Sequence, residues 1–159
     1  MKTNHFIKRI CTTLLFIFLF GQSYINAEST VYFFIDYTFW ISEYPFTVDG
    51  ENAFSLIPEG KPVVKDGPLS YNKVMRKVIF EHPGTYVIST GYQYNGVSRD
   101  VTLNLNVEND ETYYVWINAS LKKPFYIEQL DEKKGLKLLN KATKDKKYTI
   151  NEDFIYKGN

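Results

Sequence analysis

Cysteine is almost absent from the chain. The single cysteine among the 159 residues, Cys11, lies inside the apolar run Ile10–Phe20. If that run is removed with a signal peptide, the remaining chain has no thiol, and so no disulfide, thiolate nucleophile or thiolate metal ligand. Because Cys11 lies well before the expected cleavage point after Ala27, it cannot be the lipid-bearing first residue of a bacterial lipoprotein. The sequence therefore predicts a domain with neither disulfides nor a lipid anchor.

Long apolar runs are absent after residue 27. Lys2, Lys8 and Arg9 precede Ile10–Phe20, and the small residue Ala27 follows, which is the pattern of a cleaved signal peptide. The run is also shorter than the roughly 20 residues that cross a bilayer comfortably. We expect residues 1–27 to be cleaved, the mature chain to have no transmembrane segment, and the protein to be periplasmic or extracellular in a bacterium.

A large excess of charge of one sign is absent too. Residues 1–27 hold three of the 19 basic side chains and none of the 18 acidic ones, so the mature chain has 16 basic and 18 acidic residues and a net charge of −2. Nucleic acids and anionic membranes bind basic surfaces. A near-neutral chain argues against both kinds of partner.

Histidine is scarce, and after residue 27 only His82 is left. A Ser-His-Asp site would have to use it. However, His82 directly precedes Pro83 and Gly84, which suit positions i+1 and i+2 of a type II turn between two apolar runs. We interpret His82 as a solvated residue at the corner of a β-hairpin, and we expect no catalytic residue.

Metal ligands are equally few. With one histidine and no cysteine, a metal would need oxygen ligands, and the acidic clusters are Asp110–Glu111 and Asp131–Glu132. Neither has the spacing of a calcium loop, and a turn and a helix N-terminus favour acidic residues in any case. We expect no metal and no cofactor.

Extended segments dominate the rest of the chain. Val31–Trp40 is apolar on both alternating faces, which indicates a strand covered on two sides. Val101–Val107 alternates apolar and polar residues without error, and Thr112–Ala119 follows as another strand. Asp49-Gly50 and Asn95-Gly96 are hairpin-turn signals. Residues 51–72 contain three prolines and two glycines and predict a long decorated loop.

The spacing of apolar residues changes in the C-terminal part of the chain. Phe125–Leu130 predicts a last strand, and Asp131 can cap a short helix that packs its leucines on a sheet. We expect one domain over residues 28–142 and a polar C-terminal tail over residues 143–159, whose Ile150 and Phe154–Tyr156 either dock as a final strand or stay loose. The predicted fold is an all-β, antiparallel β-sandwich, mostly of meander hairpins, with a short C-terminal helix packed on it.

Aromatic residues are abundant. After residue 27 there are 12 tyrosines, eight phenylalanines and two tryptophans. Most are explained by a sandwich core. On Thr112–Ala119, alternation places Tyr114 and Trp116 on the face opposite Val115. If exposed, they form an aromatic strip that could stack on sugar or pack on protein, together with Trp40. Burial under the C-terminal helix is the alternative.

The order of several short motifs resembles a known family. Phe46-Thr-Val-Asp-Gly50, Pro83-Gly-Thr-Tyr86, Glu111-Thr-Tyr-Tyr-Val115 and Phe125–Glu132 follow one another as in the secreted bacterial domain of unknown function 2846, which is similar in style to the PEGA-type β-sandwich. The resemblance covers roughly residues 31–141 and rests on generic strand and turn chemistry. It implies a small β-sandwich of the bacterial cell envelope, and no catalytic residues are established for that group.

Three functions are open at this point. The first is a non-catalytic secreted or cell-envelope module that binds or assembles with another envelope or extracellular protein. The second is a carbohydrate-binding module that uses Trp116, Tyr114 and Trp40 on a glycan. The third is a hydrolase with two catalytic carboxylates, for which the sequence has no local signature. The sequon Asn118-Ala119-Ser120 would matter only in a eukaryotic secretory pathway.

Overall fold

The computed structural model describes residues 28–38, 43–58, 72–94, 96–119, 124–145 and 148–158. The expected signal peptide, residues 1–27, lies outside the described residues, as do Trp40 and residues 59–71 of the predicted loop. The beginning of that loop is a correction: residues 51–56 form a strand, because they pair with residues 44–48 across the turn at Asp49-Gly50.

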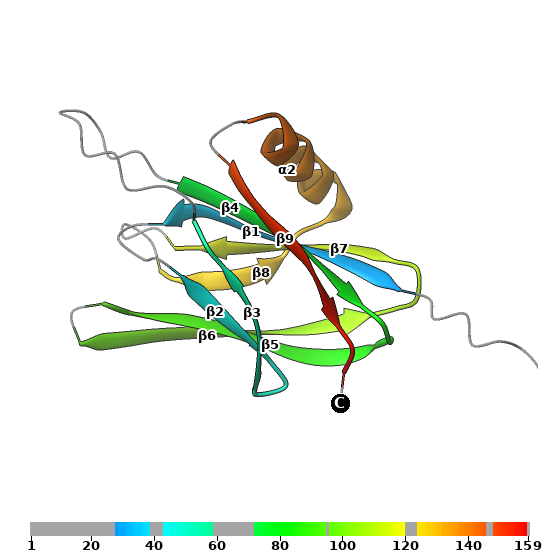
Figure 1. Cartoon of the computed structure of the whole chain (residues 1–159), viewed down its shortest axis with the longest axis horizontal. Helices are drawn as coiled ribbons and strands as arrows, with labels where there is room; N and C mark the ends of the chain where they lie inside the picture. Colours follow the sequence, from blue (N-terminus) through cyan, green and yellow to red (C-terminus); the bar gives the residue numbers. More distant parts are fainter. Residues whose placement is uncertain are drawn as a thin grey trace, which may run out of the picture.

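The described residues form two packed β-sheets with one helix on the outer side of the first (Figure 1). The first sheet, sheet A, has five strands in the order β8-β7-β1-β4-β9, and the second, sheet B, has four in the order β3-β2-β5-β6. The elements are β1 (Ser29–Thr38), β2 (Tyr44–Val48), β3 (Glu51–Leu56), β4 (Asn72–Phe80), β5 (Gly84–Tyr94), β6 (Val97–Val107), β7 (Thr112–Asn118), β8 (Tyr126–Gln129), α2 (Glu132–Lys144) and β9 (Tyr148–Tyr156). The predicted all-β sandwich with a C-terminal helix is confirmed.

Sheet A is less hairpin-like than the sequence predicted. β1 pairs antiparallel with β4 but parallel with β7, and β4 pairs parallel with β9. Parallel neighbours need long connections, and here these run through sheet B or through α2. Hairpins join β2 to β3 and β5 to β6 in sheet B.

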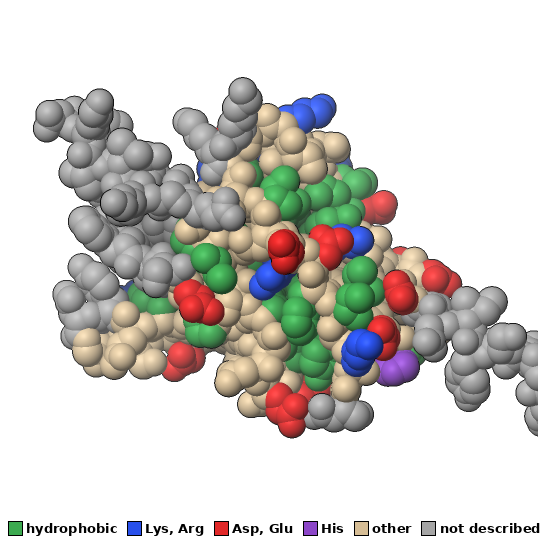
Figure 2. All heavy atoms as spheres, viewed as in Figure 1, with side chains coloured by type: hydrophobic (Ala, Val, Ile, Leu, Met, Phe, Trp, Pro, Cys, Tyr) green, Lys and Arg blue, Asp and Glu red, His purple; other side chains and the backbone are tan. Residues whose placement is uncertain are grey.

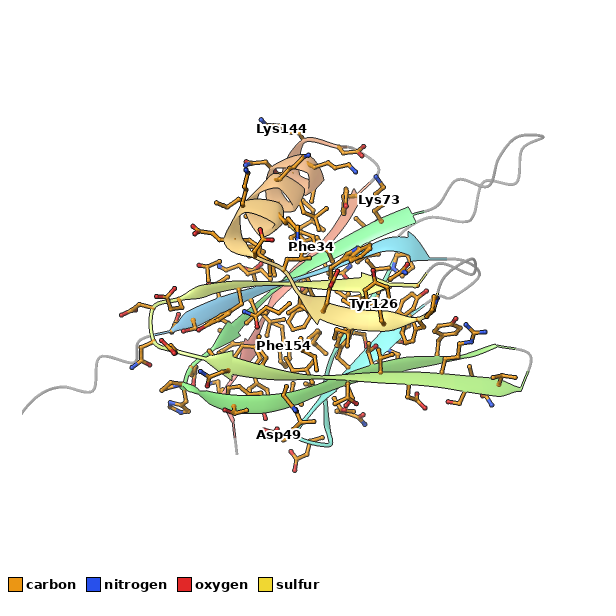
Figure 3. The ribbon with its side chains drawn as sticks, turned by 180° about the vertical axis from the view of Figure 1, so that it is seen from behind. Phe34, Asp49, Lys73, Tyr126, Lys144 and Phe154 are labelled. Carbon is orange, nitrogen blue, oxygen red and sulfur yellow. The ribbon has the colours of Figure 1, made fainter. Side chains whose placement is uncertain are left out.

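β1 lies at the centre of sheet A, as its two-sided apolar pattern predicted. Val31, Phe33 and Ile35 point between the sheets into the main core, whereas Phe34 belongs to a second apolar cluster on the outer face. Figure 3 shows Phe34 on the side of sheet A that faces α2. Burial on both faces explains why residues 31–35 in the middle of β1 are apolar or aromatic without interruption.

Both predicted hairpin turns join neighbouring strands, although Asn95 of the second turn lies outside the described residues. Asp49 and Gly50 connect β2 to β3 and both have positive φ, 53° and 86°. This is the geometry of a type I′ turn, for which Asp-Gly is favoured because glycine has no Cβ to clash. Gly96, between β5 and β6, also has a positive φ of 76°.

The segment around Pro83 differs from its prediction. β4 belongs to sheet A and β5 to sheet B, so residues 81–83 connect the two sheets and are not a hairpin corner. Gly84 starts β5 and is not among the glycines with positive φ, which excludes the predicted type II turn at that position. His82 is exposed at this crossing, and its carbonyl oxygen accepts a hydrogen bond from Tyr86 Oη at 2.8 Å.

The C-terminal tail is also different from the leading expectation. Asp131 caps α2 as predicted, since its side chain accepts a hydrogen bond from the backbone N–H of Lys134 at 2.9 Å. Beyond the helix, residues 148–156 form the edge strand β9, so the docked alternative holds and the sandwich extends past residue 142. Phe154 and Tyr156 pack against the main core, and Figure 3 shows Phe154 between the sheets.

Side chains from sheet A close one open edge of the sandwich. Arg76 donates from Nη1 to the carbonyl oxygen of Ser55 on β3 at 2.6 Å and from Nε to that of Glu152 on β9 at 2.8 Å. Asn151 accepts from the backbone N–H of Ile57 and donates to its carbonyl oxygen, at 2.8 and 2.9 Å. Partial burial lowers the pKa of Arg76, and carboxylates at residues 152 and 153 act in the opposite direction. We call this set of bonds the edge latch.

Candidate functional site

The predicted aromatic strip on β7 does not form an exposed surface. Tyr114 is only 4% exposed and lies beneath α2, so the alternative of burial under the helix holds for it. Its ring stacks on Tyr32 with centroids 5.8 Å apart, and burial raises the pKa of its phenol. Trp40, the third proposed residue, lies outside the described residues. Tyr114 is therefore too buried to form an exposed strip with Trp116 and Trp40.

Trp116 is half-buried. It packs against the outer cluster and meets Tyr126 of β8 edge to face, with centroids 5.6 Å apart. Its indole N–H is buried and has no hydrogen-bond partner in the part of the chain that the structure describes. Tyr126, also half-buried, has a raised pKa because of desolvation and the nearby carboxylate of Glu128. The two rings are only partly exposed and meet edge to face, so they do not form a single flat surface on which a ligand could stack.

The residues weighed for chemistry have structural roles. The carboxylate of Asp131 caps α2 and pairs with Lys134 Nζ at 2.9 Å, which lowers the pKa of Asp131 through the hydrogen bonds from Lys134. Asn118 of the sequon is 2% exposed and donates to the carbonyl oxygen of Pro124 at 3.3 Å. Among the described residues, no group of three or more His, Cys, Asp or Glu side chains is placed to hold a metal.

The outer side of sheet A has a second feature that the sequence did not point out. Aliphatic side chains of α2 and of the neighbouring β9 are exposed on this side: Leu136 of α2 is 41% exposed, and Ile150 and Ile155 of β9 are 53% and 48% exposed. Together with half-buried Ile79 we call these the outer apolar patch. Figure 2 shows hydrophobic side chains gathered on this side of the molecule, below α2 and over β9.

Register places these side chains on one face. In the parallel pairing of β4 with β9, Met75 lies opposite Ile150 and Ile79 lies opposite Ile155. Met75 packs in the cluster beneath α2, which identifies this as the outer face. Three of the six large apolar side chains exposed in the described chain are therefore on the α2 side of sheet A. Single exposed apolar residues are common, but a group on one face marks an interaction surface.

Ion pairs interrupt and border the patch. Lys77 of β4 pairs with Asp153 of β9 at 3.2 Å, within the same face. Lys73 pairs with Asp145 at 3.6 Å and lies over the ring of Tyr148, 5.1 Å from its centroid. Pairs this exposed contribute little stability, but they give the surface defined polar groups beside its aliphatic ones.

The helix above the patch has a basic solvent side. Lys133, Lys137, Lys141 and Lys144 are all exposed, and we call them the lysine ridge. Figure 3 shows Lys144 on the side of α2 that faces away from the sheets. The opposite side of the helix holds the buried Gly135 and Ala142.

Sequence reasoning missed the patch because its signal was ambiguous. Ile150 and Ile155 were noted only as residues that could dock, and five lysines in a 13-residue helix are usual for a solvated face. The parallel pairing of β9 with β4 brings them together, and it depends on contacts between residues 75 or 76 positions apart in the sequence, which have no local signature.

Comparisons with known proteins add no relatives: no family model, curated protein or solved structure matches the chain. The resemblance to the domain of unknown function 2846 therefore stays a prediction. In the part of the chain that the structure describes, no helix has both the length and the apolar character needed to cross a membrane.

Proposed function

We propose that the protein is an exported, non-catalytic β-sandwich of the bacterial periplasm or extracellular space that works by binding another protein. The observation that carries this proposal is the outer apolar patch of Leu136, Ile150 and Ile155 beside α2. Protein interfaces combine a buried apolar centre with a polar rim. The ion pairs Lys77–Asp153 and Lys73–Asp145 and the lysine ridge supply such a rim here.

Position-specific crosslinking tests the proposal in the native setting. A photoreactive phenylalanine analogue would replace Leu136 or Ile155 in the full-length chain expressed in a bacterial host with an envelope. Val87 on sheet B, which is 41% exposed, serves as the matched control position. We expect a discrete adduct with a second protein from the α2 side and none from Val87.

A second variant decides whether the adduct depends on the patch. Replacing Ile150 by serine in the chain that carries the analogue at Leu136 should remove the adduct, because it removes apolar area that the partner would bury. Replacing Val87 by serine should leave it unchanged. Equal labelling from Leu136 and Val87, or labelling that survives Ile150→Ser, would refute binding through this patch.

Export is tested separately by the mass of the protein recovered from the envelope or medium. Cleavage after Ala27 leaves Glu28 as the first residue, directly before Ser29, the first residue of β1. We expect the intact mass of a chain that begins at Glu28. A cytoplasmic protein that retains residues 1–27 would contradict the proposed compartment.

Glycan binding is a second candidate, because Trp116 and Tyr126 form a partly exposed aromatic pair on the outer side of β7 and β8. Aromatic rings stack on the apolar faces of sugars. A polysaccharide array gives the test: binding that disappears in Trp116→Ala but persists in Ile155→Ser would favour a carbohydrate-binding module over the protein-binding proposal.

A further inference from the structure

The lysine ridge is a linear array of charge on a rigid helix. Its members are spaced by four, four and three residues, and with 3.6 residues per turn this places them along one side of α2. The ridge from Lys133 to Lys144 is about 16 Å long at 1.5 Å per residue. Asp131 caps the helix, and Gly135 and Ala142 are buried on the side of the helix that packs on sheet A. The ridge is therefore held in a fixed position above sheet A.

None of the four ridge lysines is in an ion pair with a described residue. In the described part of the chain, the lysines with ion pairs are Lys73, Lys77, Lys134 and Lys157, and none of these belongs to the ridge. Lys133 lies in the first turn, where the helix dipole disfavours a cation. Stability of the helix therefore does not explain the whole ridge.

The rest of the molecule has the opposite balance. Residues 28–58, which include β1, β2 and β3, contain no lysine or arginine but five carboxylates. On sheet B, Asp49 and Asp100 are exposed. The net charge of −2 that argued against a basic surface is thus the sum of a basic helix and an acidic remainder. Local charge, and not the net charge, determines what a docking segment meets at short range, since salt screens beyond about 8–10 Å.

We propose that the partner of the α2 side is an acidic, amphipathic protein segment, which places apolar side chains on the outer apolar patch and carboxylates along the lysine ridge. This inference rests on the proposed protein-binding function and adds the chemical character of the segment that binds. Lysine–carboxylate pairs along the rim set the orientation and accelerate association, while the patch supplies the buried area.

Two observations favour a protein segment over an anionic membrane. An extended anionic plane meets the field of the whole mature chain, residues 28–159, whose net charge is −2, and this opposes binding. In addition, Ile150 and Ile155 lie on the sheet beside the helix, whereas the lysines lie on its solvent side. A plane resting on the ridge leaves the isoleucines uncovered. To meet both, a segment must lie on the isoleucines and extend over α2.

A defined probe tests this without knowledge of the natural partner. The probe is a synthetic helical peptide of leucine and glutamate in an amphipathic pattern, and its control has lysine in place of every glutamate. Binding to the mature full-length protein is measured by fluorescence anisotropy at about 50 mM and 500 mM salt, which changes the screening length more than threefold. We expect the acidic peptide to bind, the basic one not to, and high salt to weaken binding.

Three variants separate the inference from the proposed function. The ridge variant replaces Lys133, Lys137, Lys141 and Lys144 by glutamine, which preserves helix propensity, and we expect about tenfold weaker binding of the acidic peptide. Arg99→Gln, an exposed cation on β6, is the matched control and should leave affinity unchanged. Ile150→Ser with Ile155→Ser removes the patch and should also weaken binding.

The possible outcomes separate the acidic-partner inference from the proposed protein-binding function. Loss in the patch variant with full binding in the ridge variant overturns the acidic-partner inference and leaves the protein-binding function standing. Loss in the ridge variant with full binding in the patch variant supports an acidic ligand but refutes the patch as the docking site. Absence of peptide binding, or ridge-dependent binding to phosphatidylglycerol vesicles in its place, overturns the inference.

Discussion

Gly135 of α2 lies directly on the ring of Tyr114 in β7. A Cβ at position 135 would lie 2.1 Å from Cγ and 2.6 Å from Cβ of that tyrosine, far inside van der Waals contact. The helix can approach sheet A only because residue 135 has no side chain. This contact explains why Tyr114 is buried and why a glycine, which weakens a helix by about 1 kcal/mol relative to alanine, is found in its first half.

The first prediction concerns this contact. Gly135→Ala should destabilise the protein by about 1–3 kcal/mol, although alanine favours the helix, because the helix must move off the root of a ring that cannot rotate away. Denaturant unfolding measures the effect. Asn140→Ala, on the exposed side of α2, is the control and should be neutral or slightly stabilising. A more stable Gly135→Ala would show that the helix does not pack on Tyr114 in this way.

The second prediction concerns a buried phenol. Tyr44 is fully buried, and its hydroxyl has no hydrogen-bond partner in the described part of the chain. An unsatisfied buried polar group costs about 1–3 kcal/mol. Tyr44→Phe should therefore leave stability unchanged or raise it. Tyr86→Phe should lower it by about 1 kcal/mol, because the hydroxyl of Tyr86 donates to the carbonyl oxygen of His82. Equal losses in both variants would contradict this.

The third prediction follows from the same phenol at high pH. Burial, with a smaller effect from Tyr92, raises the pKa of Tyr44 well above its ordinary value of 10.0. Below pH 10 the folded and unfolded chains both keep this proton, so it has no effect on stability. As the pH rises above 10, the unfolded chain loses the proton first, and the free energy of unfolding falls by up to about 1.4 kcal/mol per pH unit.

Tyr44→Phe removes that contribution. We expect its advantage over the wild type, measured by urea unfolding, to be constant below pH 10 and to grow between pH 10 and pH 11. The same unfolding measurement on Tyr113→Phe, a substitution at a half-buried position on β7, serves as the control. If the difference between Tyr44→Phe and the wild type stayed flat over this range, the phenol would not be desolvated in solution.

The fourth prediction tests β9 by adjacent residues on opposite faces. Phe154 packs against Phe54 with centroids 5.7 Å apart, whereas Ile155 is 48% exposed on the outer face. Phe154→Ala should cost about 3 kcal/mol and Ile155→Ala at most about 0.5 kcal/mol. Thermal or denaturant unfolding gives both values. A disordered polar tail would make the two substitutions equally harmless.

These residues also show which features a single sequence can predict. Val101–Val107 alternates because β6 has one buried and one solvated face, and the structure has Leu105 and Val107 buried with Asn104 and Asn106 exposed. Asp49-Gly50 and Asp131 act through the backbone of their immediate neighbours. In each case the residues that determine the local structure lie within a few positions of the sequence pattern, so the pattern alone is enough to predict that structure.

Errors arose where the cause is distant in the sequence. Pro83 and Gly84 indicate a change of direction, but not whether the chain stays in its sheet or crosses to the other. The residues near Tyr114 left its exposure open, with burial under the C-terminal helix as one alternative, because the contact that decides it involves Gly135, 21 residues later. The candidate surface on the α2 side likewise exists only after β9 pairs with β4.

The edge latch has a consequence for self-association. A free edge strand exposes a row of unpaired carbonyl and N–H groups that can template another chain. The carbonyl of Ser55 on β3 is already bonded to Arg76, and both backbone groups of Ile57, the residue directly after β3, are bonded to Asn151. Strand-by-strand growth into fibrils is therefore opposed at the C-terminal end of β3, where neither a proline nor a lysine on β3 is needed as gatekeeper.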